Sequence, residues 1–288
     1  MQQPFIYNEA FSRNIGWLTR EEQNRLQQKK VAIAGLGGVG GFHLLTLSRL
    51  GIERFHLAEF DIFDLANFNR QTGANIETIG LSKLDVMIRE ALKINPNLEI
   101  SRFSNGVNEN NSEAFLTDVD IYVDGLDFFA FKARQHIFAS CATKNIPAVT
   151  AAPLGMGTAV LNFTPGSMTF EDYFGFKNSS EEEKGLRFFI GLAPSRLQMS
   201  YLVDPTTIDL ANRKGPSTIM ACQLCAGAAA TEVLKILLGR GPIRAAPKGY
   251  HFDAYLNKLA LTWRPWGNRN PLSRLAIFLA RHKLKRTQ

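Results

Sequence analysis

The sequence predicts an α/β fold: a Rossmann-like, doubly wound, mostly parallel sheet, extended by antiparallel strands and completed by a C-terminal helix and hairpin. Three observations predict it. Short apolar strands alternate with amphipathic helices from residue 31 to about residue 164. The first of these strands runs directly into a glycine-rich stretch that opens a helix. The alternation then ends in a strand-like segment that closes on Pro165-Gly166, where the simple βα repeat stops.

The individual elements follow from hydrophobic periodicity and from breaker residues. The strands are expected at residues 31–34, 55–59, 98–103, 121–124 and 147–151. The clearest helix covers residues 83–94, because an apolar stripe recurs at helical spacing and Asn95-Pro96 ends it. Further along, residues 218–238 are expected to form a long buried helix and residues 250–265 a hairpin.

This pattern divides the chain into five parts. Residues 1–30 form an N-terminal helical segment, and residues 31–164 form the expected nucleotide-binding core. A substrate-recognition or crossover region follows at residues 165–216, then a helix and hairpin that complete the fold at 217–268 and a basic amphipathic C-terminal helix at 269–288. Residues 165–216 lack clear periodicity, which is typical of a lid or a partner-recognition segment. Their run FEDYFGF, with Phe188 and Phe189, offers apolar anchors for a docked protein or peptide, and core packing is the alternative.

Composition limits the class of protein. With 288 residues, 45% hydrophobic and 20% charged, the chain suits one large globular domain. No apolar run reaches the roughly 20 residues that span a bilayer, and the polar start MQQPFIYNEAFSRN lacks the features of a signal peptide, so we expect a cytoplasmic protein. The formal net charge of +7 favours polyanionic partners such as nucleotides, tRNA or an anionic membrane surface.

Basic residues gather near the C-terminus. Leu275, Phe278, Leu279 and His282 recur at helical spacing, and they are surrounded by Arg274, Arg281, Lys283, Lys285 and Arg286. We expect a terminal helix whose apolar side docks on the body of the protein or on a partner subunit. A membrane-surface or RNA-binding tail is the alternative, and it is not favoured.

The three cysteines are Cys141, Cys222 and Cys225. An odd, low count argues against a disulfide framework. Cys222 and Cys225 supply only half of a tetrahedral zinc site and fall in a run of small residues that predicts a buried helix. We therefore expect structural thiols and no zinc.

The stretch GLGGVGG follows the first strand and begins the next helix, which is the context in which such a motif binds a nucleotide. Its backbone N–H groups and the helix N-terminus would face a phosphate with no Cβ in the way. The motif alone does not separate NAD, FAD or S-adenosylmethionine from ATP. An acid at the end of the second strand, Glu59 or Asp61, would hold ribose hydroxyls in each case.

Two cations and two carboxylates favour a triphosphate. Arg70 follows the second strand and Lys83 opens the next helix, and cleavage of a triphosphate needs such fixed cations where a dinucleotide does not. Asp124 and Asp127 leave the fourth strand at its carboxyl end, where ligands bind in open α/β sheets. These carboxylates would suit the Mg²⁺ that accompanies ATP.

These motifs together resemble the E1-like (ThiF/MoeB/HesA-type) adenylyltransferase superfamily. The resemblance rests on GLGGVG with Glu59, NFNRQ, GLSKLDV, INPNLEI, VDGLD and the upstream FSRNIG. It covers residues 10–165 by motif order and spacing, and residues 218–263 more weakly. The superfamily includes proteins that activate sulfur carriers for molybdopterin and thiamine, ubiquitin-activating enzymes, and the tRNA threonylcarbamoyladenosine dehydratase.

The resemblance implies a role for each matching residue. The turn under the nucleotide would be formed by Gly35, Gly37, Gly38 and Gly40. Glu59 would stand at the ribose, where the family usually has Asp. The phosphates would be contacted by Asn67, Arg70 and Lys83, and Asp127, with Asp124 less favoured, would bind Mg²⁺ at the α-phosphate. Arg13 would reach into the site of a partner subunit, so a homodimer is implied; Arg20 and Arg25 are alternatives to it.

The implied reaction is attack by a carboxylate on the α-phosphate of ATP, which gives an acyl-adenylate and pyrophosphate. The carboxylate would belong to the C-terminus of a ubiquitin-like or sulfur-carrier protein or of a peptide, and a modified tRNA is the nearest alternative. An NAD-dependent oxidoreductase and a non-catalytic partner subunit are alternatives of other classes. Two departures matter: Phe128 stands where carrier-activating members often have Asn, and residues 152–217 hold no cysteine for an enzyme thioester, which leaves Cys222 or Cys225 if exposed.

Overall fold

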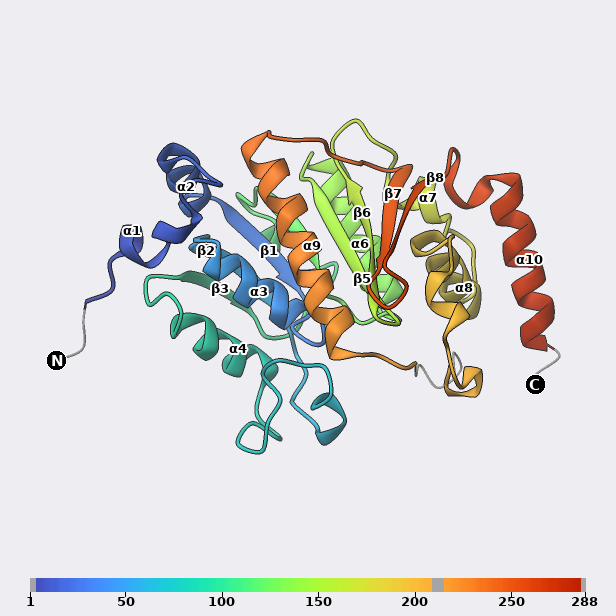
Figure 1. Cartoon of the computed structure of the whole chain (residues 1–288), viewed down its shortest axis with the longest axis horizontal. Coiled ribbons are helices and arrows are strands. Elements are labelled where there is room, and N and C mark those ends of the chain that lie inside the picture. The colour runs from blue at the N-terminus through green and yellow to red at the C-terminus, as the bar shows by residue number, and fades with distance from the viewer. Residues whose placement is uncertain (1–3, 209–214, 286–288) are drawn as a thin grey trace.

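The computed structural model describes residues 4–208 and 215–285, and its centre is one mixed sheet of eight strands in the order β3-β2-β1-β4-β5-β6-β7-β8 (Figure 1). Neighbouring strands from β3 to β5 pair in parallel, and those from β5 to β8 pair antiparallel. The strands are β1 Lys30–Ala34, β2 Arg54–Ala58, β3 Glu99–Phe103, β4 Ile121–Asp124, β5 Ala148–Leu154, β6 Gly157–Phe163, β7 Lys248–Asp253 and β8 Lys258–Trp263. The predicted fold class is confirmed.

Helices cover both faces of the sheet. One face carries α3 Gly40–Arg49, α4 Lys83–Leu92 and α9 Ile219–Leu238, and the other carries α5 Ser112–Phe115, α6 Phe131–Thr143, α7 Phe170–Phe174 and α8 Glu181–Leu192 (Figure 1). The side chains of β1 point alternately to the two faces of the sheet. Val31 and Ile33 therefore belong to the hydrophobic core on one face, and Ala32 and Ala34 belong to the core on the other. The parallel part of the sheet is thus covered on both faces, as a parallel sheet requires.

The N-terminal and C-terminal segments lie at opposite ends of the sheet (Figure 1). The N-terminal segment forms α1 Tyr7–Ala10, a short 3-10 turn at Ser12–Asn14, and α2 Arg20–Gln27, which Thr19 and Glu22 close with a capping box. The C-terminal helix α10, Pro271–Lys285, lies beside α8. Arg286 lies outside the described residues.

The described part of residues 165–216 is not irregular, contrary to the prediction. It contains α7, α8 and two short 3-10 turns at Leu197–Ser200 and Pro205–Thr207. Ser180 caps α8 by accepting from the N–H of Glu183 at 3.2 Å, and acidic residues fill the first turn, where they favour the helix dipole. Residues 209–214 of this segment lie outside the described residues.

The predicted docking anchors of this segment are wrong. Phe170, Phe174, Phe176 and Phe188 are all buried, and their rings contact one another in tilted and edge-to-face arrangements in the second core. Phe189 is partly buried against the same cluster. The five residues of α7 are too few to show helical periodicity, and aromatic residues suit a core as well as an interface. Core packing is the alternative that holds.

Helix α9 is long and apolar enough by length and composition to cross a membrane, the one such helix in the described part of the chain. The expectation that no segment reaches that length therefore fails for α9. However, 56% of its most apolar window is buried within the fold, where the helix packs on β5, β6 and α3. This matches the long buried helix that the sequence predicts.

The apolar side of α10 does not face the body of the protein, which corrects that half of the prediction; docking on a partner subunit stays a prediction. Ser273 and Ile277 are buried against the neighbouring elements, whereas Leu275, Phe278 and Leu279 are exposed. The sequence shows that a helix has two dissimilar sides but not which side docks, because that choice depends on polar partners far away in the chain.

The burial of His43 predicts that the stability of the folded protein depends on pH. It lies in α3 with 1% of its surface exposed, and neither ring nitrogen has a hydrogen-bond partner in the described structure. Burial lowers its pKa to about 4, which the charge of Asp124 only partly opposes. As the pH falls from about 6.5 toward 4, the unfolded chain therefore binds a proton that the native protein excludes, and native stability is lost.

Between pH 7 and pH 5 this loss is about 2 kcal/mol for His43 alone. The variant His43→Leu should lose that much less over the same interval, measured as the free energy of unfolding in urea at each pH. Burial also lowers the pKa of His56 and of His251, so a weaker dependence should remain in the variant. An unchanged slope in His43→Leu would show that His43 is not the group responsible.

Candidate functional site

The glycine turn joins β1 to α3 and fits tightly against the loop that follows β4. Gly35 has a φ of +83°, and a Cβ at this position would collide with the backbone of Gly125. A Cβ at Gly40 would collide with the carbonyl oxygen of Gly35. The turn and the loop carrying Asp127 are therefore held together at the carboxyl ends of β1 and β4.

The remaining two glycines are not required by the packing of the protein itself. A Cβ at Gly37 would lie 3.6 Å from Gln71 Nε2, and one at Gly38 would lie 3.5 Å from Cys222 Sγ, both ordinary contacts. No side chain in the described residues caps the N-terminus of α3. Backbone that is bare and open beside an uncapped helix N-terminus fits a phosphate group.

Glu59 directly follows β2 and reaches the glycine turn. It is 9% exposed, and its Oε2 accepts the N–H of Leu36 at 2.7 Å. Its Oε1 accepts the N–H groups of Phe60 and Asp61 at 2.8 and 3.0 Å. The two bonds to Oε1 use its acceptor sites, whereas Oε2 accepts one bond and has a lone pair left for a further donor. Its role at the ribose stays a prediction.

Asp61, the competing acid, does not contact the turn. Its Oδ2 lies 2.5 Å from Nζ of Lys83, which is 5% exposed and stands 5.9 Å from the centre of the Phe63 ring. Burial alone would raise the pKa of Asp61, but the hydrogen bond and charge of Lys83 hold that pKa below its usual value. The sequence did not predict this pair, which fixes the ammonium group at the start of α4.

Arg70 lies beside the glycine turn. Its Cδ would be 3.9 Å from a Cβ on Gly38, and its Nη1 donates to the carbonyl of Ala66 at 2.8 Å and to Asn69 Oδ1 at 2.9 Å. The guanidinium is thus anchored on the same loop that supplies it. Arg70 has the position that contact with a phosphate on the turn would need.

Asn67 has a local structural task. It ends a short 3-10 turn, Leu65–Asn67, and its Oδ1 accepts the N–H of Asp64 at 3.0 Å in a capping box. Nearby, Asn69 donates to the carbonyl of Ser217 at 2.9 Å, which ties this loop to the start of α9. The predicted contact of Asn67 with phosphate stays a prediction.

Asp124 and Asp127 differ in what occupies their oxygens. Asp124 is 3% exposed, and it accepts from Arg134 Nε at 2.8 Å and from Thr150 Oγ1 at 2.9 Å. Asp127 is exposed, and one of its oxygens accepts the N–H of Phe129 at 2.9 Å. Only Asp127 therefore presents an open carboxylate oxygen to a cation.

Arg134 is the site residue that sequence reasoning missed. It is 2% exposed, and it donates to the carbonyls of Leu126 at 2.8 Å, Asp127 at 3.0 Å and Phe128 at 3.1 Å. Its guanidinium also stands 4.6 Å from the centre of the Phe188 ring on α8. One side chain thus holds the loop on which Asp127 stands. The available signal was an arginine in the middle of the apolar stripe of α6.

Arg13 lies far from the site of its own chain. It is exposed, and its segment contacts the C-terminal end of α9, where Arg240 Nη2 donates to the carbonyl of Trp17 at 2.9 Å. Gly38 instead lies at the N-terminal end of α9, beside Cys222. A helix of 20 residues is about 30 Å long, so Arg13 is not brought to the glycine turn.

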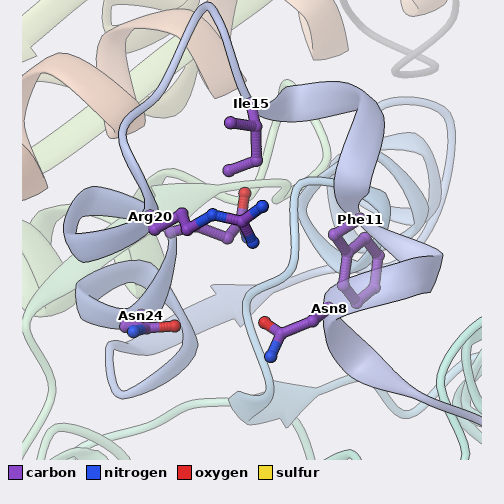
Figure 2. Close-up of a pocket in the computed structure, with 6 residues that line it drawn as sticks. Asn8, Phe11, Ile15, Arg20 and Asn24 are labelled. Atoms are coloured by element: carbon purple, nitrogen blue, oxygen red, sulfur yellow. The ribbon is translucent and has the colours of Figure 1, made fainter.

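The two alternatives to Arg13 also lie away from the turn. Arg20 lines a cavity of about 80 Å³ inside the N-terminal segment, together with Asn8, Phe11 and Asn24 (Figure 2). Arg25 donates to the carbonyl of Leu238 at 3.5 Å, near the end of α9. Among these three arginines, none contacts the glycine turn within its own chain.

The donor set fits a magnesium ion that arrives with a nucleotide. Among the described residues, no three His, Cys, Asp or Glu side chains gather closely enough to hold a metal on their own. Mg²⁺ usually binds through one or two carboxylates, substrate phosphates and water, so a single open carboxylate at Asp127 suits it. Cys222 and Cys225 are buried, and burial raises the pKa of both thiols, against a smaller lowering from Ser217 at Cys222.

The profile of one family, described as the ThiF family, matches residues 11–274. The chain belongs to the ThiF family. It is 32% identical over 142 residues to the tRNA threonylcarbamoyladenosine dehydratase of Bacillus subtilis (strain 168), covering 49% of this chain and 55% of that protein. It is 29% identical over 143 residues to the sulfur carrier protein ThiS adenylyltransferase of Escherichia coli (strain K12), covering 50% of this chain and 56% of that protein.

This ThiF-family chain spans about half the length of these curated relatives. Solved structures show the same fold. The structure of PaaA has a TM-score of 0.67 at 18% identity, covering 91% of this chain and 77% of that one. E. coli MccB with ATP has a TM-score of 0.64 at 22% identity, covering 90% and 73%. The predicted resemblance to E1-like adenylyltransferases is confirmed at the level of family and fold.

Proposed function

We propose that this protein is an ATP-dependent adenylyltransferase, which activates a carboxylate as an acyl-adenylate and releases pyrophosphate. The observation that carries the proposal is the pairing of a bare, uncapped glycine turn with two anchored cations. Arg70 crosses beside Gly38, and Lys83 is a buried ammonium group at the start of α4. A dinucleotide would need the turn but not the cations. Transfer at a triphosphate needs both.

Each polar or charged group of the site has its own role in the proposed reaction. The N–H groups of the turn and the N-terminus of α3 receive phosphate oxygens, while Arg70 and Lys83 offset the charge that grows on the pyrophosphate as it leaves. A carboxylate oxygen attacks the α-phosphorus, and the bond from that phosphorus to the bridging oxygen of the β-phosphate breaks. Mg²⁺, held by Asp127, would supply further charge compensation between the two reacting anions.

We infer that the carboxylate belongs to the C-terminus of a ubiquitin-like or sulfur-carrier protein or of a peptide. One relative is named as the adenylyltransferase of the sulfur carrier protein ThiS, and a crystal structure of E. coli MccB contains MccA. A tRNA-linked carboxylate is the second candidate, favoured by the similarity to the dehydratase. An enzyme thioester is not part of the proposal, because all three thiols are buried and burial raises the pKa of each.

Calorimetry of ligand binding tests the proposal most directly. The protein should bind ATP with Mg²⁺ and not NAD⁺, and it should exchange labelled pyrophosphate into ATP when a lysate fraction supplies the carboxylate substrate. Binding of NAD⁺ without ATP would replace the proposal with the oxidoreductase alternative. ATP binding with no exchange in any fraction would favour a non-catalytic partner subunit.

We further propose that two copies share their sites, with Arg13 of one reaching the nucleotide of the other. The distance between Arg13 and its own glycine turn supports this, because the length of α9 separates them. Mixing equal amounts of the Arg13→Ala and Asp127→Ala proteins should then restore about a quarter of wild-type exchange. Half of the dimers formed contain one chain of each variant, and one of the two sites in such a dimer is intact. If Arg13 acted within its own chain, the mixture would stay as inactive as its components.

A further inference from the structure

The basic character of the protein resides entirely in its C-terminal eighth. The last acidic residue is Asp253, and residues 254–288 contain eight Lys and Arg but no Asp or Glu. Because the whole chain has a formal net charge of +7, the other 253 residues have a net charge of −1. The body is therefore nearly neutral, and one contiguous segment is a polycation.

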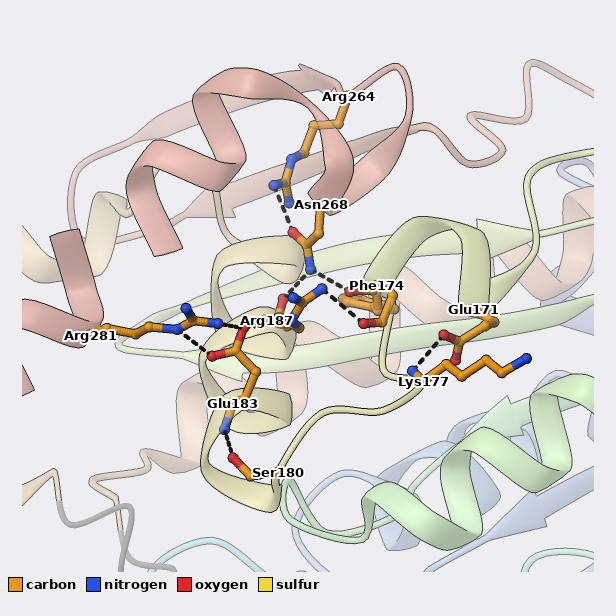
Figure 3. A network of polar contacts seen from close by, with 10 residues as sticks. Glu171, Phe174, Lys177, Ser180, Glu183, Arg187, Arg264, Asn268 and Arg281 are labelled. Atoms are coloured by element: carbon orange, nitrogen blue, oxygen red, sulfur yellow. Dashed lines mark hydrogen bonds and ion pairs between the residues drawn. The ribbon is translucent and has the colours of Figure 1, made fainter. Parts of the chain in front are cut away.

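A buried polar network fixes the start of α10 to the body (Figure 3). Arg264 is 6% exposed, and it donates to the carbonyl of Ile190 at 2.8 Å and to the hydroxyl of Ser273. It also donates to Asn268 Oδ1 at 2.9 Å, as Figure 3 shows. Asn268 in turn donates to the carbonyls of Phe174 and Arg187 at 2.8 and 2.9 Å. The entry into α10 is thus set by α7 and α8.

An ion-pair cluster fixes the helix further along. Arg281 Nε donates to Glu183 Oε2 at 2.6 Å, and Arg187 Nε donates to Glu183 Oε1 at 2.7 Å (Figure 3). Burial would raise the pKa of Glu183, but the two guanidinium groups hold it below its usual value, so this carboxylate stays charged. Ser273, Ile277 and Arg281 therefore define the inner face of α10.

The outer face of α10 is apolar and uncovered. Leu272 is 79% exposed, Leu275 54% and Leu279 58%. At about 100° per residue these three leucines fall on the side of the helix opposite Ser273 and Ile277. The inner polar contacts hold them outward, so the exposure is a property of how the helix docks.

We propose that this outer face of α10 lies on an anionic membrane surface, with the leucines in the acyl boundary and exposed basic residues of the segment, such as Arg269 and Arg274, at lipid phosphates. A helix with a leucine face, basic flanks and no acidic residue is the pattern that lies in the membrane interface. Exposed tryptophans precede it, Trp263 at 69% and Trp266 at 66%, and tryptophan favours the headgroup level. Because α10 is already docked on α8, binding needs no coupled folding.

Charge and chemistry favour lipid over the other candidate occupants. A second copy packed on this face in a two-fold interface would set the acid-free segment against itself, like charge against like charge. Single-stranded nucleic acid binds by stacking its bases on aromatic rings; Trp263 and Trp266 offer such rings, but the three leucines of the outer face would stay in water. An anionic bilayer offers acyl chains to the leucines and phosphate groups to the positive charges at the same time.

Vesicle flotation with the full-length protein tests the proposal. Wild-type protein should float with vesicles of 70% phosphatidylcholine and 30% phosphatidylglycerol, and not with pure phosphatidylcholine. Leu275→Glu and Leu279→Glu should each weaken that binding roughly tenfold or more, as expected for losing one buried leucine. Val203→Glu is the matched control, because Val203 is 96% exposed and lies outside this segment, and it should bind as wild type does.

Three outcomes would overturn the proposal. Wild type that fails to float with anionic vesicles overturns it, and so does equal binding by the Leu→Glu variants when their thermal unfolding is unchanged. A shift in oligomeric state or a loss of tRNA retention in those variants, without vesicle binding by wild type, would assign the face to a second copy or to RNA. ATP binding in solution should be the same in all variants, so a failure here leaves the proposed function standing.

Discussion

Replacing Lys83 with methionine should lower the rate of ATP–pyrophosphate exchange by about 10²- to 10⁴-fold. The ammonium group of Lys83 is 5% exposed and is held by Asp61, so its charge acts in a poorly solvated position where it is worth more than at the surface. Methionine retains most of the apolar stem against Phe63 but removes the charge. The measurement is exchange at saturating ATP, with nucleotide binding followed by calorimetry.

Asp61→Asn separates a chemical role of Lys83 from a structural one. It breaks the same ion pair but leaves the cation in place. If the pair only stabilises the start of α4, both variants should lose thermal stability to a similar degree and neither should lose exchange specifically. The proposed role requires Lys83→Met to lose far more exchange than Asp61→Asn, with both proteins folded, because only the first removes the charge.

The parts of the site that the sequence predicts are those set by local backbone. The glycine turn, the acid at the end of β2 and the start of α4 at Lys83 depend on short-range features, namely a strand, a tight turn and a helix cap at Ser82. The parallel pairing of β1 to β5 follows from the βα repeat, because each helix between two strands makes the crossover that parallel neighbours require. These features do not depend on how side chains distant in the sequence pack together.

The parts that the sequence does not predict depend on partners distant in the chain. Arg134 occupies a position of α6 that periodicity assigns to the apolar core, and only the carbonyls of the Asp127 loop and the carboxylate of Asp124 explain its burial. The direction that α10 faces is set by Arg264 and Glu183, which lie 9 and 90 residues before Ser273. In both cases a buried polar group overrides the apolar pattern, since leaving it unpaired would cost more than exposing leucines.

Phe170 and Phe188 show the opposite error. Aromatic residues in a segment without periodicity suggested a docking surface, but the cluster fills the space between α6, α7 and α8. The same residue types serve a core and an interface, because both bury aromatic area away from water. Composition alone does not distinguish them.

Arg134→Lys should lower the exchange rate at saturating ATP by about 10- to 100-fold, because a misplaced Asp127 loop misaligns the reacting groups. Lysine retains the charge beside Asp124 but lacks the planar fork that reaches the carbonyls of Leu126, Asp127 and Phe128. Arg134 contacts the loop rather than the nucleotide, so it is a positioning residue. The expected signature is a reduced turnover and a higher requirement for Mg²⁺, with little change in the KM for ATP.

Arg264→Lys is the matched control. Arg264 is also a buried arginine that donates to a carbonyl and to side chains, but its partners join α8 and α10 rather than the Asp127 loop. Each substitution should destabilise the protein by about 1–3 kcal/mol, because each leaves buried acceptors unpaired. A positioning role requires the loss of exchange and the Mg²⁺ effect in Arg134→Lys alone. If the two variants lost stability alike and both kept wild-type exchange, Arg134 would be part of the core and nothing more.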